Sequence, residues 1–177
     1  MSLIEAISKS LPIDWKLYVK EHQSMIGQRS LDFYKQVKKL HNVKIVKINF
    51  YKDPKPWIEK SECVVTITGT AGFEAAMLNK PAIVFGNVFY NVIPGIKIAN
   101  SFNDLEPLFK LIETNNWNKD SKMDCAAYLK TVEEFGVGLS PRDLKVLSQK
   151  KIMSKNLDMN EEKQLEDFVD RLKTFCE

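Results

Sequence analysis

The sequence is poor in the residues that build metal centres and disulfide frameworks. Its 177 residues include two histidines and three cysteines, Cys63, Cys125 and Cys176. The cysteines are far apart and odd in number, so they match neither a zinc-binding spacing nor a set of paired disulfides. We therefore expect no metal site and a reducing, cytoplasmic setting.

Long apolar runs are also missing. No stretch approaches the roughly 18 apolar residues that cross a bilayer, and the N-terminus lacks the basic and then apolar order of a signal peptide. The sequence predicts no transmembrane segment. Peripheral association with a membrane stays open.

The charge is nearly balanced, with 26 lysines and arginines against 23 acidic residues and a formal net charge of +3. Lysines gather between Lys35 and Lys55, without an RNA-binding signature or interleaved aromatic residues. We interpret them as a solvated face, the alternative being a basic rim that steers an anionic ligand. Nucleic acid is not an expected partner.

Several catalytic signatures are absent. The sequence has no Ser-His-Asp triad pattern, no glycine-rich loop ending in Gly-Lys-Ser/Thr and no His-Glu-x-x-His. Gly69 and Gly72 are separated by two residues and no third glycine follows, so the dinucleotide fingerprint Gly-x-Gly-x-x-Gly is missing. Dinucleotide binding at this crossover is therefore not expected.

Short apolar strands alternate with helical segments over the first hundred residues. The patterns predict strands within residues 15–20, 43–48, 63–68, 81–85 and 96–99, and helices within residues 3–11, 30–40, 56–60, 73–78, 104–115 and 121–135. After Ser101 only helices are predicted, and two more begin at Pro141 and after Asn160.

This alternation is typical of a parallel sheet covered on both faces. We predict an α/β protein, a Rossmann-like three-layer α/β/α domain with a parallel sheet of about five strands and a helical C-terminal tail. The domain is expected over residues 1–135 and the helical extension over residues 136–177. Right-handed crossovers would place the C-terminal strand ends, with His22, Gly69 and Gly86, along one rim.

The stretch from Cys63 to Glu74 is the part of the sequence that most favours a ligand. A β-branched run ends in a tight turn, and a helix begins at once, which points free N–H groups and the positive end of a helix dipole at one place. This suits a phosphate, although the same glycines also serve close packing. The turn consists of Gly69, Thr70, Ala71 and Gly72.

Glu74 separates these two interpretations. A capping carboxylate pairs with a residue three positions earlier, whereas Thr70 and Glu74 are four apart. A carboxylate beside a phosphate also needs hydroxyl groups from which to accept hydrogen bonds, and a ribose supplies them. We therefore favour Glu74 as an acceptor for sugar hydroxyls over a simple helix cap.

Lys20 ends the first predicted strand and His22 lies just beyond it. Ligand groups in open α/β sheets gather at this end of the strands, and Arg29 in the next loop adds a further cation. His22 is a candidate to contact a phosphate or to stabilise a leaving group, the alternative being an ordinary solvated histidine.

Three segments in this order resemble a known family. They are residues 19–22 (Val-Lys-Glu-His), 69–76 (Gly-Thr-Ala-Gly-Phe-Glu-Ala-Ala) and 79–90, which include Pro81, Gly86 and Phe89-Tyr90. Together they resemble the nucleotide-binding half of GT-B glycosyltransferases, and most closely the bacterial capsule and surface polysaccharide biosynthesis family. The resemblance covers roughly residues 15–111.

The resemblance implies a nucleotide-sugar donor, linked to CMP or UDP, as the substrate, with no other cofactor. It implies His22 near the donor phosphate as the catalytic residue, Glu74 near the ribose, and Lys20 and the amides of residues 69–72 at the phosphate. Gln23 stands where the family has proline, which loosens this loop.

A GT-B enzyme has two such domains and this chain has room for one. The expected partner is therefore an N-terminal GT-B domain, in cis or in trans, without which no transfer occurs. Two alternatives are half of a sugar-nucleotide 2-epimerase and a non-enzymatic interaction module. The second would use the aromatic loop at residues 87–95 and the late helices to bind a partner.

Overall fold

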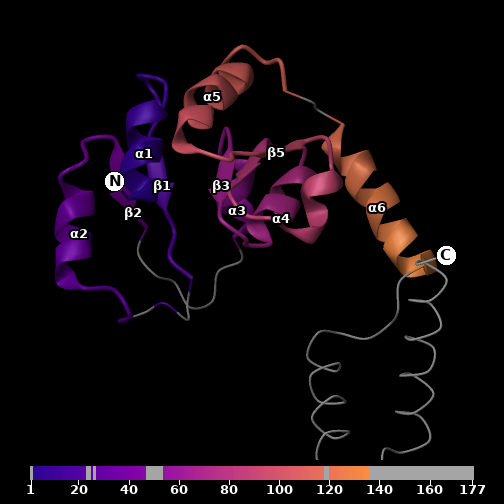
Figure 1. Ribbon diagram of the computed structural model, residues 1–177, viewed down its shortest axis with the longest axis horizontal. Coiled ribbons are helices and arrows are strands. Elements are labelled where there is room, and N and C mark those ends of the chain that lie inside the picture. The colour runs from indigo at the N-terminus through magenta and orange to yellow at the C-terminus, as the bar shows by residue number, and fades with distance from the viewer. Residues whose placement is uncertain (1, 23–24, 26, 47–53, 118–119, 136–177) are drawn as a thin grey trace, which may run out of the picture. The chain divides into compact units, whose positions relative to one another are not determined.

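The computed structural model describes residues 2–22, 25, 27–46, 54–117 and 120–135 (Figure 1). The chain divides into two compact units, Met1–Ala126 and Ala127–Glu177. The second unit is described over residues 127–135, which continue a helix that begins in the first. The extension predicted over residues 136–177 lies outside the described residues, and the predicted domain boundary stays a prediction.

Helices and strands alternate in the order that the sequence predicts. The strands are β1 (Leu17–Val19), β2 (Val43–Ile45), β3 (Val64–Thr66), β4 (Ala82–Val84) and β5 (Ile96–Ile98). The helices are α1 (Leu3–Ser10), α2 (Leu31–Lys38), α3 (Lys55–Glu59), α4 (Ala71–Met77), α5 (Leu105–Glu113) and α6 (Ser121–Phe135), with short 3₁₀ turns η2 (Phe89–Val92) and η3 (Phe102–Asp104).

Polar residues at the helix ends explain where several helices begin and end. Ser30 caps α2, because its hydroxyl accepts a hydrogen bond from the Phe33 N–H at 3.3 Å. Asn79 and Asn115 follow α4 and α5 with φ angles of 55° and 61°. Asparagine tolerates this left-handed conformation better than most residues, so both positions stop a helix.

The five predicted strands are present and parallel, but they form two sheets. β1 pairs with β2, and β3, β4 and β5 pair in that order. The expectation of one sheet of five strands is therefore not met in the described residues. Leu17 of β1 and Val65 of β3 contact the same apolar cluster, so packing of side chains, rather than a shared ladder, connects the two sheets.

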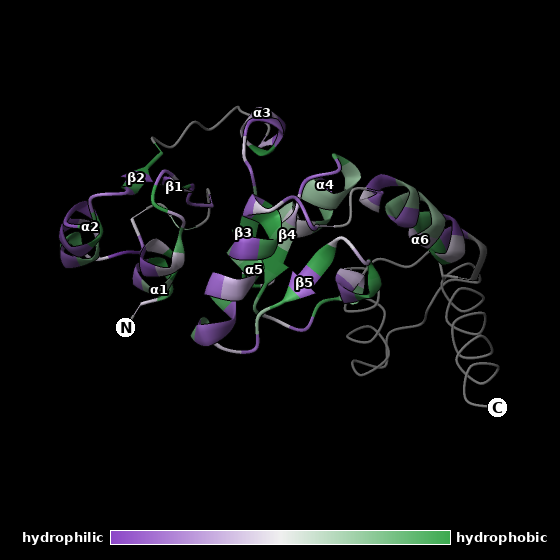
Figure 2. Cartoon of the chain, turned by 90° about the horizontal axis from the view of Figure 1, so that it is seen from above, coloured by the Kyte–Doolittle hydropathy of each residue, from purple (hydrophilic) through white to green (hydrophobic). Residues whose placement is uncertain are grey.

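The core of the first unit draws on both sheets and on two helices, α1 and α5. Its buried members are Ala6, Ile7, Ile83, Ala99, Leu105, Phe109, Ile112 and Trp117. β4 is buried at all three positions, and it is apolar throughout in Figure 2. A fully buried central strand with a run of apolar residues is typical of a parallel sheet covered on both faces.

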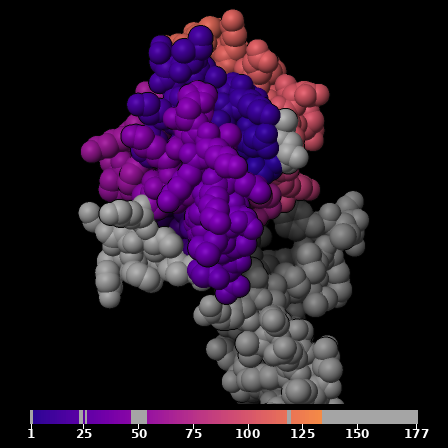
Figure 3. Space-filling model, turned by 90° about the vertical axis from the view of Figure 1, so that its left-hand side faces the viewer, coloured from indigo at the N-terminus to yellow at the C-terminus, as the bar shows by residue number. Residues whose placement is uncertain are grey.

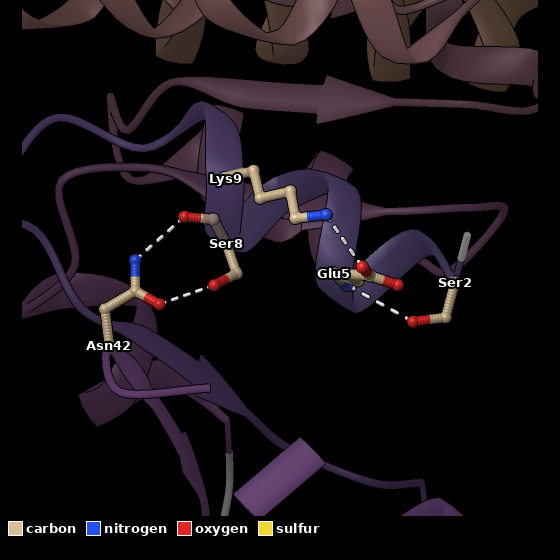
Figure 4. A network of polar contacts seen from close by, with 5 residues as sticks. All are labelled: Ser2, Glu5, Ser8, Lys9 and Asn42. Carbon is tan, nitrogen blue, oxygen red and sulfur yellow. Dashed lines mark hydrogen bonds and ion pairs between the residues drawn. The ribbon is translucent and has the colours of Figure 1, made fainter. Parts of the chain in front are cut away.

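A polar network joins α1 to the turn before β2 (Figure 4). The Asn42 side-chain amide donates to the Ser8 carbonyl at 2.8 Å, and the Ser8 hydroxyl donates back to Asn42 Oδ1 at 2.5 Å. At the other end of α1, the Ser2 hydroxyl accepts from the Glu5 N–H. These bonds hold α1 against the turn before β2. The N-terminal segments form the surface that faces the viewer in Figure 3.

Candidate functional site

The glycine turn between β3 and α4 is held by two side chains from outside it. The Gly69 N–H donates to Thr66 Oγ1 at 3.1 Å. The Tyr90 hydroxyl donates to the Gly69 carbonyl oxygen. Tyr90 is fully buried. Its hydrogen bond therefore attaches the exposed turn to the interior of the protein.

Two of the four turn amides already have an acceptor in the protein. Besides Gly69, the Gly72 N–H approaches the Gly69 carbonyl at 3.4 Å. Within the described part of the chain, the N–H groups of Thr70 and Ala71 donate to no residue. They precede or begin α4, where helices leave N–H groups without an intrahelical acceptor. The donors that the turn offers to a ligand are therefore those of Thr70 and Ala71.

Glu74 lies in the first turn of α4 and is half-buried. Its Oε1 accepts a hydrogen bond from the Thr70 hydroxyl at 2.9 Å, and Thr70 makes no side-chain cap. The four-residue spacing thus produces a hydroxyl-to-carboxylate contact rather than a capping box. The carboxylate already accepts from one hydroxyl, which is the chemistry that a sugar hydroxyl would offer.

Gly72 and Gly86 allow close packing beneath the turn. A Cβ atom at Gly72 would lie 3.2 Å from the edge of the Tyr90 ring and 3.3 Å from Val84 Cγ1. At Gly86 it would lie 2.5 Å from Thr68 Cγ2. The Gly86 N–H donates to the Ile67 carbonyl at 2.8 Å, so the ends of β3 and β4 meet at one edge as predicted.

The aromatic loop after β4 is divided between interior and surface. Phe89 is 63% exposed, whereas Tyr90 beside it is buried. The rings of Phe73 and Phe89 have centroids 6.3 Å apart. Burial, together with the negative charge of Glu74, raises the pKa of Tyr90, which keeps its phenol protonated as a donor to Gly69.

Lys20 and His22 follow β1 and are exposed. β1 belongs to the two-stranded sheet and Gly69 follows a strand of the other sheet. The common rim that we predicted depends on a single sheet. Because β1 and β3 belong to different sheets, no continuous sheet edge connects these residues in the described part of the chain. The structure brings Thr70, Glu74 and the glycines together and places Lys20 and His22 in a second group.

Glu21, between Lys20 and His22, is the least expected residue of this segment. Its side chain is only 5% exposed. Arg29 Nε lies 3.0 Å from Glu21 Oε1 and forms an ion pair with it, although the angles do not fit a hydrogen bond. The Tyr34 hydroxyl donates to Oε2 at 2.9 Å. Arg29, which we expected among the ligand-binding cations, instead pairs with Glu21 and stacks over the Phe33 ring at 4.5 Å.

Sequence reasoning thus missed three residues that shape the site: Thr66, Tyr90 and Glu21. The strand alternation that predicted β1 also places Glu21 on its inward side, so a signal for its burial was present. No local pattern indicates that Tyr90, which is 21 residues away, bonds to Gly69.

Comparison with protein-family models identifies this chain with one family. Residues 2–106 match the capsule polysaccharide biosynthesis protein family, and the chain belongs to it. The match supports a role in capsule synthesis and confirms this part of the predicted resemblance. Comparisons with curated proteins and with solved structures gave no match.

Among the described residues, no helix is both long and apolar enough to cross a membrane.

Proposed function

We propose that this chain is the donor-binding domain of a GT-B glycosyltransferase and binds a nucleotide-activated sugar for capsule or surface polysaccharide synthesis. The observation that carries the proposal is the glycine turn, with the N–H groups of Thr70 and Ala71 and the Glu74 carboxylate within one helical turn. Membership of the capsule polysaccharide biosynthesis family supports the same conclusion.

The chemistry of the turn matches the two polar parts of a nucleotide. Amide N–H groups at the start of a helix are donors for phosphate oxygens. A carboxylate cannot contact the phosphate without repulsion, but it accepts hydrogen bonds from the ribose hydroxyls nearby. In this arrangement a ribose hydroxyl donates to Glu74, either in place of the Thr70 hydroxyl or in addition to it.

His22 and Lys20 are proposed to contact the donor phosphate from the end of β1. The Glu21 side chain anchors this segment through Arg29 and Tyr34. An imidazole there stabilises the negative charge that develops on the departing nucleotide. Transfer also requires a second GT-B domain, in cis or in trans, to hold the acceptor.

Isothermal titration of the full chain with CMP, CDP, UMP, UDP and the adenine and guanine nucleotides tests the proposal. We expect saturable binding of at least one pyrimidine nucleotide. Glu74→Ala should weaken that binding by about 1–3 kcal/mol, because a hydrogen bond to a charged acceptor is lost. Glu113→Ala, an exposed glutamate in the last turn of α5, should leave the affinity unchanged.

Absence of binding by every nucleotide at millimolar concentration would refute the proposal. Equal weakening by both substitutions would show that the effect does not arise at the glycine turn.

A further inference from the structure

The residues that lead into the Lys20 and His22 segment alternate between two sides. Along residues 15–22 every second side chain is partly or largely buried, as the two-residue period of a strand requires. The exposed set is Lys16, Tyr18, Lys20 and His22, opposite Trp15, Leu17, Val19 and Glu21. β1 therefore presents one row of polar and aromatic side chains to solvent.

Two further residues extend this row sideways. The register pairs Tyr18 with Lys44 on β2, and Lys44 is exposed. Trp57 of α3 packs on Tyr18 with ring centroids 5.7 Å apart. Tyr18 remains 49% exposed and Trp57 remains 43% exposed. We call Lys16, Tyr18, Lys20, Lys44 and Trp57 the β1 face.

The cations of the β1 face have no carboxylate partner in the described part of the chain. None of the ion pairs among the described residues involves Lys16, Lys20 or Lys44. Charges of one sign on a surface attract ligands of the other sign and raise their local concentration. The face is thus complementary to an anion.

The spacing favours an extended anion over a small one. Lys16 and Lys20 lie one residue before and one residue after β1, and four residues of extended backbone span roughly 13 Å. Tyr18, which packs against Trp57, lies between them on the same exposed side, so we do not expect a single small anion to contact both lysines. A chain-like ligand instead passes over the rings and contacts the lysines in turn.

We propose that the β1 face binds an acidic glycan chain. The carboxylates of the glycan pair with Lys16, Lys20 and Lys44, and the apolar C–H face of a sugar ring packs on Trp57 and Tyr18, which combine apolar area with a polar tip. Membership of a capsule polysaccharide family makes a glycan the matching polyanion. The inference rests on that membership and not on the nucleotide proposal.

The test measures binding of the full chain to fluorescently labelled oligomers of polygalacturonate and polysialic acid. A neutral dextran oligomer of equal length is the control ligand. We expect saturable binding of an acidic oligomer, none of dextran, and a lower affinity as salt increases, because exposed charges are screened.

The variant Lys16→Gln/Lys44→Gln avoids Lys20, which belongs to the nucleotide proposal. It should weaken glycan binding roughly fivefold to tenfold, as expected for two exposed charge contacts. Lys97→Gln/Lys110→Gln removes the same charge from exposed positions on β5 and α5 and should have little effect. Trp57→Ala should weaken binding without changing its salt dependence.

Failure of both acidic oligomers to bind, or equal effects of the two double variants, would overturn this inference. Tighter binding of single-stranded DNA than of either acidic glycan would overturn it as well. Nucleotide titration of Lys16→Gln/Lys44→Gln keeps the two proposals apart, because its nucleotide affinity should equal that of the unchanged chain.

Discussion

Tyr90 connects the glycine turn to the interior. Its ring packs against Gly72, and its hydroxyl donates to the Gly69 carbonyl. Because the ring is buried while Gly69 is exposed, the turn has a fixed attachment on one side and faces solvent on the other. This preorganises the N–H groups of Thr70 and Ala71 before a ligand arrives.

Removing the Tyr90 hydroxyl should loosen this attachment. We expect Tyr90→Phe to lower the free energy of unfolding by about 0.5–1.5 kcal/mol, the usual net value of one hydrogen bond. Urea denaturation measures the change. Tyr18→Phe, at a half-exposed ring, is the matched control and should change stability little. An unchanged midpoint for Tyr90→Phe would show that the hydroxyl bond does not hold the turn.

The Tyr34 phenol provides a prediction of pH dependence. Its hydrogen bond to Glu21, with burial and the Glu21 charge, raises the pKa of Tyr34 above its ordinary value of 10.0, and Arg29 opposes this. The folded state therefore keeps a proton that the unfolded state loses first. The stabilisation is complete below the unfolded pKa and is lost as the pH rises through the folded pKa.

Above pH 10, we expect the free energy of unfolding to fall more steeply with pH in the unchanged chain than in Tyr34→Phe. The lysines titrate in both proteins, so their contribution drops out when the two slopes are compared. Urea denaturation at several alkaline pH values measures both slopes. Parallel slopes would mean that Tyr34 does not titrate with folding.

At this scale, the sequence indicates which residue types gather at the turn but not their distant partners. Thr70 and Glu74 are close in sequence, so their contact follows from helical spacing. Tyr90 and Gly69 are 21 residues apart, and the pairing of β4 with β3 brings their segments together, which is why no local pattern revealed this bond.

At the scale of elements, α4 depends on close approach to β4. Gly72 has no side chain, and Tyr90 and Val84 occupy the space that a Cβ atom would need. α4 begins at Ala71, inside the glycine turn and earlier than the apolar pattern predicted. The last two residues of the glycine turn are therefore also the first two residues of α4.

Gly72→Ala should push α4 away from the sheet. We expect a loss of about 1–3 kcal/mol in the free energy of unfolding, the usual range when extra atoms enter a packed core. Met77→Ala, on the exposed side of the same helix, is the control for a substitution in α4 that adds no atoms to the core. Thermal denaturation compares the two, and a Gly72→Ala protein as stable as the control would contradict this packing.

Element positions were predictable because each strand and helix carries its own hydrophobic period. Sheet pairing was not, since five strands of three residues each can be ordered in several ways that bury the same apolar residues. The connection between β2 and α3 crosses residues 47–53, which lie outside the described part of the chain.

At the scale of the whole molecule, the family match and the strand-rich part of the chain nearly coincide. The match covers residues 2–106, and β5, the last strand of the described residues, ends at Ile98. Helix α5, which follows, contributes Leu105, Phe109 and Ile112 to the same core. The core of the first unit thus extends beyond the matched segment, and the proposed site lies within that segment.

The central claim is that the glycine turn holds a nucleotide, and ¹⁵N chemical-shift titration of the full chain tests it most directly. On addition of the tightest-binding nucleotide, we expect saturable shifts of the Thr70, Ala71 and Gly72 amides, with the Lys97 amide as an unaffected reference. Saturable shifts confined to other segments, or no saturable shift at millimolar nucleotide, would contradict the claim.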